Sequence, residues 1–143
     1  MIPDIITEGE FKGWSTWKTE AFEYDAAGPF HYKVDDKGVV CAFRVMPKHM
    51  NQGGAVHGGC LMTFADFTLF AIAKDVFQGD DYGVTVAFAS EFLSGARLGQ
   101  LVEARGEVLR EGGSLIFVRG LMTAGGAPCL NYSATLKRIR SRK

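Results

Sequence analysis

The chain has 143 residues, and its 47% hydrophobic content suits one globular domain with a sizeable core. We therefore expect a single domain over residues 1–143, in which 1–28 form a variable N-terminal segment. Sixteen basic and sixteen acidic residues cancel to a net charge of zero, which argues against the broad positive field of nucleic-acid and membrane-surface binders. A small-molecule partner is expected, with no nucleic acid and no membrane.

The first residues lack the basic region, apolar core and cleavage site of a secretory signal, so a cytoplasmic location is expected. Cys41, Cys60 and Cys129 are odd in number, far apart and embedded in apolar segments. This spacing favours packed, reduced thiols over disulfides or a metal site. His31 and His49 lack a convincing set of further ligands, so no metal is expected.

The first predicted elements are two strands, which form a hairpin in "PFHYKVDDKGVVCAFRV" with its turn at "DDKG". A long apolar run then extends from Cys60 to Ala73. It is too short for a membrane span and is interrupted by Asp66, so we predict a buried helix that begins at Gly58 and Gly59. Apolar side chains fall on nearly every side of this helix, which indicates that other structure encloses it.

Four strands are predicted after the helix. "LVEARGEVL" and "CLNYSATLK" alternate apolar and polar residues with a period of two, and "VTVAFASEFL" and "SLIFVRGLM" are rich in strand-forming residues. The glycine-rich turns "REGGS" and "TAGGAP" predict an antiparallel meander. The fold class is therefore α+β, a long antiparallel sheet wrapped around one central helix.

Asp66 is unexpected in this setting, because an ionised carboxylate buried without a partner costs several kcal/mol. Asp66 either reaches a polar seam, meaning a row of polar groups between packed elements whose hydroxyl or amide donors satisfy it, or it lines a cleft as a reactive group. The turn "NQGGAVHGG" favours the second interpretation, because it places bare backbone N–H groups at a helix N-terminus, where they can stabilise an oxyanion. The turn has neither GxxxxGK[ST] nor GxGxxG, the two phosphate-binding patterns.

"NQGGAVHGG" followed by "LMTFADF", with Asn six residues before the His and Asp nine after it, resembles the hotdog-fold acyl-CoA thioesterases of the phenylacetate-pathway and 4-hydroxybenzoyl-CoA type. The resemblance runs from about Pro29 to Ile139, and the N-terminal segment lies outside it. It implies hydrolysis of an acyl- or aryl-CoA to the free acid and CoA. Coenzyme A would be part of the substrate, and no separate cofactor is implied.

The resemblance also implies a role for each residue of the motif. The Gly58 N–H would polarise the thioester carbonyl, and Asn51 would hydrogen-bond near the thioester or the attacking water. Asp66 would either activate that water or attack the carbonyl itself. Thr85 would position the water or the carboxylate, although a strand threonine is also typical of a plain strand former. His57 falls at the motif's His, where a role in shaping the turn is favoured over acid/base chemistry.

Gly58 and Asp66 are eight positions apart on one helix, which separates their backbones by about 12 Å at roughly 1.5 Å per residue. One thioester carbonyl cannot easily contact both groups of one chain, so we predict a homodimer with shared active sites. The resemblance implies the same dimer, which is often paired into a tetramer.

The residues predicted to contact the substrate are Gly59, Phe67, Phe70, Phe88 and Arg97, although a Phe-rich helix and strand are also typical of plain core. The basic tail "KRIRSRK" either meets the CoA phosphates or is a solvated terminus. The alternative functions are a non-catalytic acyl-CoA-binding sensor and a hotdog-fold enoyl-CoA hydratase. The motif spacing favours hydrolysis over hydration, and the N-terminal segment is a poor helix-turn-helix candidate.

Overall fold

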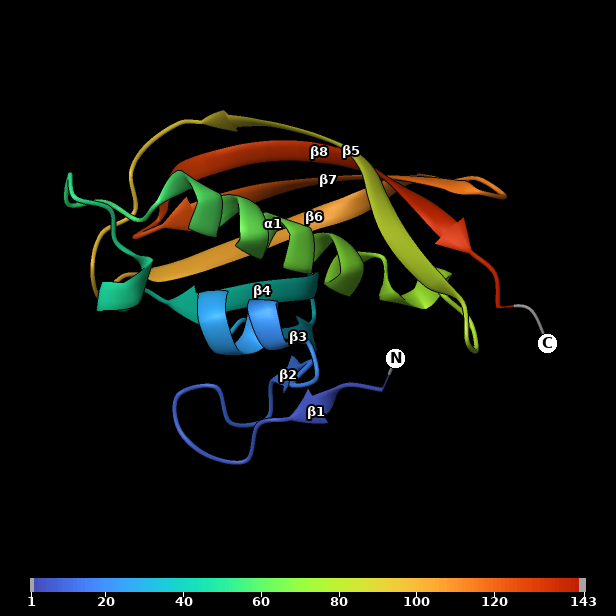
Figure 1. Ribbon diagram of the computed structural model, residues 1–143, viewed down its shortest axis with the longest axis horizontal. Helices are drawn as coiled ribbons and strands as arrows, with labels where there is room; N and C mark the ends of the chain where they lie inside the picture. Colours follow the sequence, from blue (N-terminus) through green and yellow to red (C-terminus); the bar gives the residue numbers. More distant parts are fainter. Residues whose placement is uncertain (1, 142–143) are drawn as a thin grey trace.

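An eight-stranded antiparallel sheet curves around one long helix in the computed structural model, which describes residues 2–141 (Figure 1). The helix is α1 (Gly58–Ile72), and η1 (Phe22–Ala27), η2 (Pro47–His49) and η3 (Lys74–Val76) are short helical turns. The order across the sheet is β1-β2-β3-β4-β6-β7-β8-β5. The strands are β1 (Asp4–Ile5), β2 (Ser15–Thr16), β3 (His31–Asp35), β4 (Gly38–Arg44), β5 (Tyr82–Phe92), β6 (Leu101–Glu111), β7 (Leu115–Ala124) and β8 (Ala127–Ile139).

The structure confirms the predicted α+β class, the start of α1 at Gly58, the hairpin of β3 and β4, and the four strands after the helix. The meander comprises β6, β7 and β8, which the two glycine-rich turns connect. β5 does not pair with β6, the next strand along the chain. It pairs with β8, and β6 pairs with β4. β5 is therefore the last strand of the sheet, and its outer edge pairs with no described strand.

The predicted alternation in β6 and β8 separates a core face from an outer face. Val102, Ala104, Leu130, Tyr132 and Leu136 are buried on the face toward α1. In α1, the Thr68 hydroxyl donates to the Ala65 carbonyl at 2.7 Å, so it accepts the short hydrogen bond from the hydroxyl of Tyr132. This polar contact in the core is thus fully partnered.

Aromatic packing fixes the rotation of α1 about its axis. The Phe64 ring lies 4.8 Å from Phe43 and 5.0 Å from Phe30, and the Phe67 ring lies 5.2 Å from Trp17. Each such pair contributes about 0.5–1.5 kcal/mol beyond the apolar area it buries. Successive helical residues are rotated by roughly 100°, so Asp66 projects from α1 at about this angle to Phe67.

The prediction that other structure encloses α1 holds for most of the helix and is wrong along one side. Residues spaced three and four apart form an incompletely covered stripe along the helix, and they are Gly59, Met62, Thr63, Asp66 and Phe70. Met62 is 42% exposed, and Asp66 is half-buried rather than buried. The sheet curves around one side of the helix, so this stripe is left partly open.

A β-bulge in β5 brings residues of opposite parity to one face of the strand. The register with β8 shifts between Thr85 and Ala87, so Val86 is an extra residue. Side chains alternate along a strand, and one extra residue reverses the alternation. Thr85 before the bulge and Phe88 after it can therefore both face the helix side.

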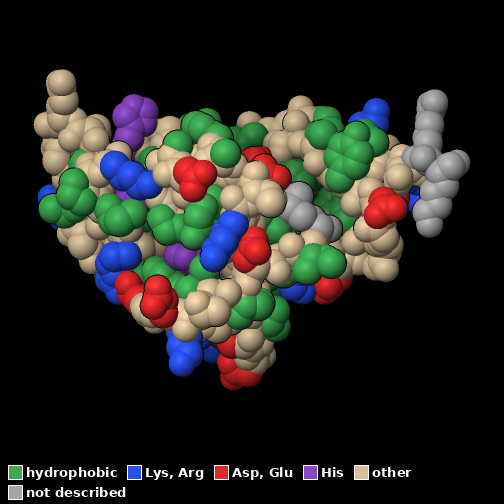
Figure 2. Space-filling model, turned by 60° about the horizontal axis from the view of Figure 1, so that its bottom comes forward, with side chains coloured by type: hydrophobic (Ala, Val, Ile, Leu, Met, Phe, Trp, Pro, Cys, Tyr) green, Lys and Arg blue, Asp and Glu red, His purple; other side chains and the backbone are tan. Residues whose placement is uncertain are grey.

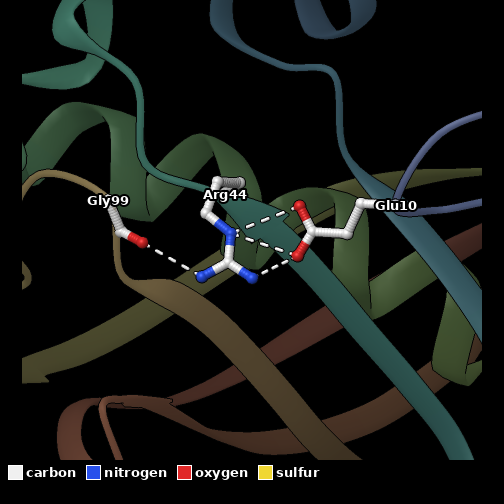
Figure 3. A network of polar contacts seen from close by, with 3 residues as sticks. All are labelled: Glu10, Arg44 and Gly99. Atoms are coloured by element: carbon white, nitrogen blue, oxygen red, sulfur yellow. Dashed lines mark hydrogen bonds and ion pairs between the residues drawn. The ribbon is translucent and has the colours of Figure 1, made fainter.

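The N-terminal segment, whose contribution the sequence left open, extends the sheet and lies beside α1. β1 and β2 add to the edge formed by β3, and η1 is next to α1 (Figure 1). Arg44 of β4 joins this segment to the loop between β5 and β6: its guanidinium pairs with the Glu10 carboxylate and donates to the Gly99 carbonyl at 3.0 Å (Figure 3). The hydrogen bond and charge of Arg44 lower the pKa of Glu10.

Acidic, basic and apolar side chains are interspersed on the face drawn in Figure 2. Among the described residues, no helix is long and apolar enough to cross a membrane.

Cys41 and Cys129 are buried and Cys60 is half-buried. In the basic tail, Arg138 is still part of β8 and pairs with Glu111 at 2.8 Å, whereas residues 142 and 143 lie outside the described part of the chain.

Candidate active site

A pocket of about 470 Å³ lies between α1, β5 and the N-terminal segment. Its apolar wall consists of aromatic side chains from three parts of the chain, namely Trp17, Phe67, Phe70, Phe77 and Tyr82. Asp66 and Thr85 contribute polar groups to the same pocket. The structure thus brings together four of the predicted site residues: Asp66, Thr85, Phe67 and Phe70.

Asp66 and Thr85 are in direct contact, because the Thr85 hydroxyl donates a hydrogen bond of 2.7 Å to the Asp66 carboxylate. Asp66 lies in the middle of α1 and Thr85 precedes the bulge of β5. The carboxylate therefore has a hydroxyl donor, as the polar-seam interpretation predicts, and it also lines a pocket, as the reactive interpretation predicts. A hydroxyl that donates to one carboxylate oxygen fixes its orientation and leaves lone pairs free to accept a proton.

The N-terminus of α1 presents one free backbone donor. The Gly59 N–H donates to His57 Nδ1 at 2.8 Å, and the Cys60 and Leu61 N–H groups donate to the His57 carbonyl. The Gly58 N–H makes no hydrogen bond to any residue from 2 to 141. His57 thus caps the helix, which agrees with a role in shaping the turn, and Gly58 is the donor that remains available to a ligand.

Glycine at positions 58 and 59 leaves room for aromatic rings. A Cβ on Gly59 would lie 3.0 Å from His57 Nδ1, so a side chain there would press on the capping ring. A Cβ on Gly58 would lie 3.2 Å from the ring of Phe92, an exposed residue at the end of β5. Phe92 therefore lies over the free N–H end of the helix, a position that the sequence did not predict.

Asn51 and His49 hold the turn that leads into α1. The Asn51 side-chain oxygen accepts hydrogen bonds from the N–H groups of Gly53 at 2.9 Å and Ala55 at 3.1 Å. His49 is buried; its Nδ1 accepts from the Met46 N–H, so its Nε2 carries the proton and donates to the Ala27 carbonyl at 2.7 Å. Burial lowers the pKa of His49. His49 is a neutral structural residue with both ring nitrogens occupied.

The predicted catalytic residues form two separate groups in one protomer. Asp66 and Thr85 lie at the pocket, whereas Gly58, Asn51 and His57 lie at the start of α1 and do not line it. Eight helical positions separate Gly58 from Asp66, which amounts to about 12 Å. Reacting groups must approach to roughly 3–3.5 Å, so the two groups do not form one site within a single chain.

Three predicted substrate contacts lie away from the pocket. Phe88 packs against Tyr132, with ring centroids 6.2 Å apart, and Gly59 belongs to the helix cap. Arg97 is exposed in the loop between β5 and β6, and its guanidinium makes no hydrogen bond to residues 2–141. None of the three lines the pocket.

Sequence reasoning missed three carboxylates of the pocket: Asp81, which precedes β5, and Glu20 and Glu23 of the N-terminal segment. Burial, reinforced by the charges of Asp66 and Glu20, raises the pKa of Glu23 from 4.5 to about 7. Glu20 and Glu23 belong to the segment "FKGWSTWKTEAFEYD", which has no clear helical or strand period. Its mixture of acidic and aromatic residues was the only signal, and it does not by itself indicate a pocket.

Residues 53–128 match the family model described as the thioesterase superfamily. This chain belongs to the thioesterase superfamily. The match covers Gly58, Asp66 and Thr85, and it confirms the resemblance stated from the sequence. This thioesterase is also 32% identical, over 102 residues, to the Pseudomonas aeruginosa protein named "Putative esterase PA0474", with 71% of this chain and 76% of the relative covered.

Solved structures share the fold of this thioesterase. A hypothetical thioesterase from Streptococcus pneumoniae, solved with coenzyme A, is 22% identical with a TM-score of 0.73, and the match covers 88% of this chain and 98% of that one. The Escherichia coli PaaI protein of the phenylacetic acid degradation operon is 19% identical with a TM-score of 0.66, covering 80% and 75%. These structures show that the chain has the hotdog fold, and its membership of the thioesterase superfamily makes it a thioester hydrolase.

Proposed function

We propose that this thioesterase hydrolyses acyl-CoA or aryl-CoA to the carboxylic acid and free CoA, with Asp66 as its general base or nucleophile. The observation that carries the proposal is the Asp66 carboxylate, oriented by Thr85 at the edge of an aromatic pocket. A carboxylate beside an apolar cavity suits a reaction in which water attacks a bound acyl carbon. That the matched Streptococcus pneumoniae thioesterase was solved with coenzyme A supports this substrate class.

In the general-base route, Asp66 takes a proton from water as the water oxygen attacks the thioester carbon. The carbonyl oxygen becomes negatively charged and accepts a hydrogen bond from the Gly58 N–H. The tetrahedral intermediate then collapses, the C–S bond breaks, and the CoA thiolate takes up the proton. In the nucleophilic route, the Asp66 oxygen attacks the carbon directly and expels the thiolate, and water hydrolyses the resulting mixed anhydride.

Each complete site would combine Asp66 and Thr85 of one subunit with Gly58 of the other. Two features support such a dimer: the outer edge of β5, which pairs with no described strand, and the partly open stripe of α1 that carries Met62, Asp66 and Phe70. A two-fold axis beside β5 would cover both features and build two equivalent sites. Covering the stripe would also remove Asp66 from water, which strengthens its interactions. Pairing of dimers into a tetramer stays a prediction.

The remaining site residues have supporting roles in this proposal. Phe67 and Phe70 form part of the acyl wall, Asn51 and His57 hold the turn that presents Gly58, and the Asn51 amide nitrogen is left to contact substrate or water. Arg97, in its exposed loop, is proposed to meet the CoA phosphates. A cytoplasmic location and a reaction without metal also stay predictions.

The test is a thiol-release assay with a panel of straight-chain, branched and aryl CoA thioesters. We expect turnover of at least one class, with loss of turnover in Asp66→Asn. Tight binding of acyl-CoA without turnover of any member would instead identify a sensor and overturn the proposal.

A further inference from the structure

The N-terminal segment contributes two unpaired carboxylates to the pocket that contains Asp66. Glu20 precedes η1 and Glu23 lies within it, and both line the pocket. Neither side chain accepts a hydrogen bond or forms an ion pair with any residue from 2 to 141. Glu23 is half-buried and Glu20 is exposed, so the charge of Glu23 is the less screened of the two and acts more strongly on whatever occupies the cavity.

Basic groups around the pocket do not offset these carboxylates. Lys74 of η3 lines the pocket, but its Nζ lies 3.2 Å from the carboxylate of Asp75. Lys48 of η2 donates to the Asp25 carbonyl at 3.2 Å, so it is held at the backbone of η1. Asp81, which precedes β5, adds a further acid to the lining. The ionisable part of the pocket is thus predominantly acidic.

The remaining wall is largely aromatic, with Trp17, Phe67, Phe70, Phe77 and Tyr82. An uncharged acyl chain gains free energy when it leaves water for such a wall. A chain that ends in a carboxylate loses the hydration of that charge and is also repelled by Glu20 and Glu23. The lining therefore favours uncharged acyl groups over acyl groups of the same length that end in a carboxylate.

We propose that Glu23, together with Glu20, is a specificity-determining residue that excludes acyl groups ending in a carboxylate and leaves uncharged acyl groups as substrates. This inference rests on the proposed function, because it takes the pocket beside Asp66 as the place where the acyl chain binds.

The exclusion has a pH dependence that follows from the surroundings of Glu23. The charges of Asp66 from α1 and Glu20 from its own segment act on Glu23. The other titratable groups of the pocket lining are Lys74 of η3, Asp81 before β5 and Tyr82 of β5. Lys48 of η2 is held at the Asp25 carbonyl and does not line the pocket. Burial and acidic neighbours raise the pKa of Glu23 to about 7. The side chain is mostly neutral at pH 6 and mostly charged at pH 8, so exclusion is stronger at pH 8.

The experiment compares hexanoyl-CoA with adipyl-CoA, which have acyl chains of equal length but differ by a terminal carboxylate. kcat/KM is measured for both at pH 6 and pH 8 in the parent, Glu23→Gln, Glu20→Gln/Glu23→Gln, and Glu103→Gln. Glu103 is exposed on β6, away from the pocket, and serves as the matched control. At pH 8 we expect the adipyl-to-hexanoyl ratio to rise roughly tenfold in Glu23→Gln and further in the double variant, the size set by one charge pair at close range. At pH 6 the Glu23→Gln change should be under about twofold, because the parent side chain is then mostly neutral.

An unchanged ratio in Glu23→Gln and in the double variant, with normal hydrolysis of hexanoyl-CoA, would overturn this inference and leave the proposed function standing. Loss of hexanoyl-CoA hydrolysis in a folded Glu23→Gln protein would also overturn it, since Glu23 would then belong to the reacting groups. If the parent hydrolyses neither this pair nor any other acyl-CoA, the proposed function fails and the inference fails with it.

Discussion

Asp66 is the residue on which the proposed chemistry depends, and its surroundings allow a conservative test. Asp66→Asn keeps an oxygen that can accept the Thr85 hydrogen bond but removes the negative charge. We expect turnover of a good acyl-CoA substrate to fall by roughly 10²–10⁴-fold, the range for loss of a general base. Substrate affinity should change much less, as judged by binding of the substrate to the variant.

Thermal stability separates this interpretation from a purely structural one. Asp66 is half-buried, has a hydroxyl partner and lies near the acidic Glu23, so removing its charge should leave the melting temperature unchanged or slightly higher. A variant that melts clearly lower yet hydrolyses acyl-CoA at the parent rate would show that Asp66 serves the fold instead.

Glu23 links protonation to stability. Its pKa is raised from 4.5 to about 7 in the folded protein, so the folded state holds this proton more tightly than the unfolded chain. Its contribution to stability is therefore present below pH 4.5 and is lost as the pH rises to about 7. Glutamine at position 23 has no ionisable group. The melting temperature of Glu23→Gln minus that of the parent should therefore rise by roughly 2–4 °C between pH 5 and pH 8.

The Asp66→Asn background provides the control for this measurement. The charge of Asp66 is one cause of the raised pKa of Glu23. The rise in relative melting temperature that Glu23→Gln produces between pH 5 and pH 8 should therefore be smaller when Asp66 is replaced by Asn. A constant difference in melting temperature between the parent and Glu23→Gln from pH 5 to pH 8 would contradict the raised pKa of Glu23.

Helix α1 begins at a position where proline tests the backbone donor directly. Proline is tolerated at the first helical position, and His57 before it has the extended ψ of 132° that a residue preceding proline requires. Gly58→Pro should therefore fold while it deletes the free N–H. We expect turnover to fall by at least ~10²-fold, the typical loss for one oxyanion donor.

Gly58→Ala is the matched control, because alanine adds a Cβ next to the Phe92 ring but keeps the N–H. Phe92 is 55% exposed and has room to move. The alanine variant should retain most of the activity that the proline variant loses. Equal losses in both would point to the contact with Phe92 rather than to the donor.

At the level of the assembly, the shared site predicts complementation between inactive variants. A mixed dimer of Asp66→Asn and Gly58→Pro subunits contains one site with both changes and one site with neither. Mixing the two should therefore restore activity, up to roughly half of the parent rate per mixed dimer. The measurement is thiol release from doubly tagged, purified mixed dimers, and inactivity of those dimers would exclude a site built from two chains.

The sequence predicted the elements whose residues show a clear period. Alternation in β6 and β8 identified the core face, and the glycine-rich turns identified which strands form the meander. The sequence did not predict that β5 lies beside β8, because no tight turn joins β5 to β6 and strand pairing across a longer loop leaves no local pattern. β1 and β2 have two residues each, too few to show any alternation.

Only part of the candidate site could be predicted, because some of its residues come together only when the chain folds. Asp66 and Gly58 were proposed because a carboxylate interrupts an apolar helix and a glycine-rich turn precedes that helix, and Thr85 was proposed through the family resemblance. The contact between Asp66 and Thr85 is present in the fold, and the roles of all three stay predictions. Glu23 was missed because it meets Asp66 only after residues far apart in the chain come together. The exposure of Asp66 was also misjudged, since the apolar composition of α1 does not reveal which side the sheet leaves uncovered.

The pocket draws its walls from residues inside the range that the family model matches and from residues that precede it. Asp66, Phe67 and Thr85 lie within residues 53–128, whereas Trp17, Glu20 and Glu23 precede that range. If the acyl group binds in this pocket, as proposed, substitutions in the leading segment should change which acyl group is accepted and leave Asp66 and Thr85 untouched. Substrate preference and hydrolysis would then be adjustable separately.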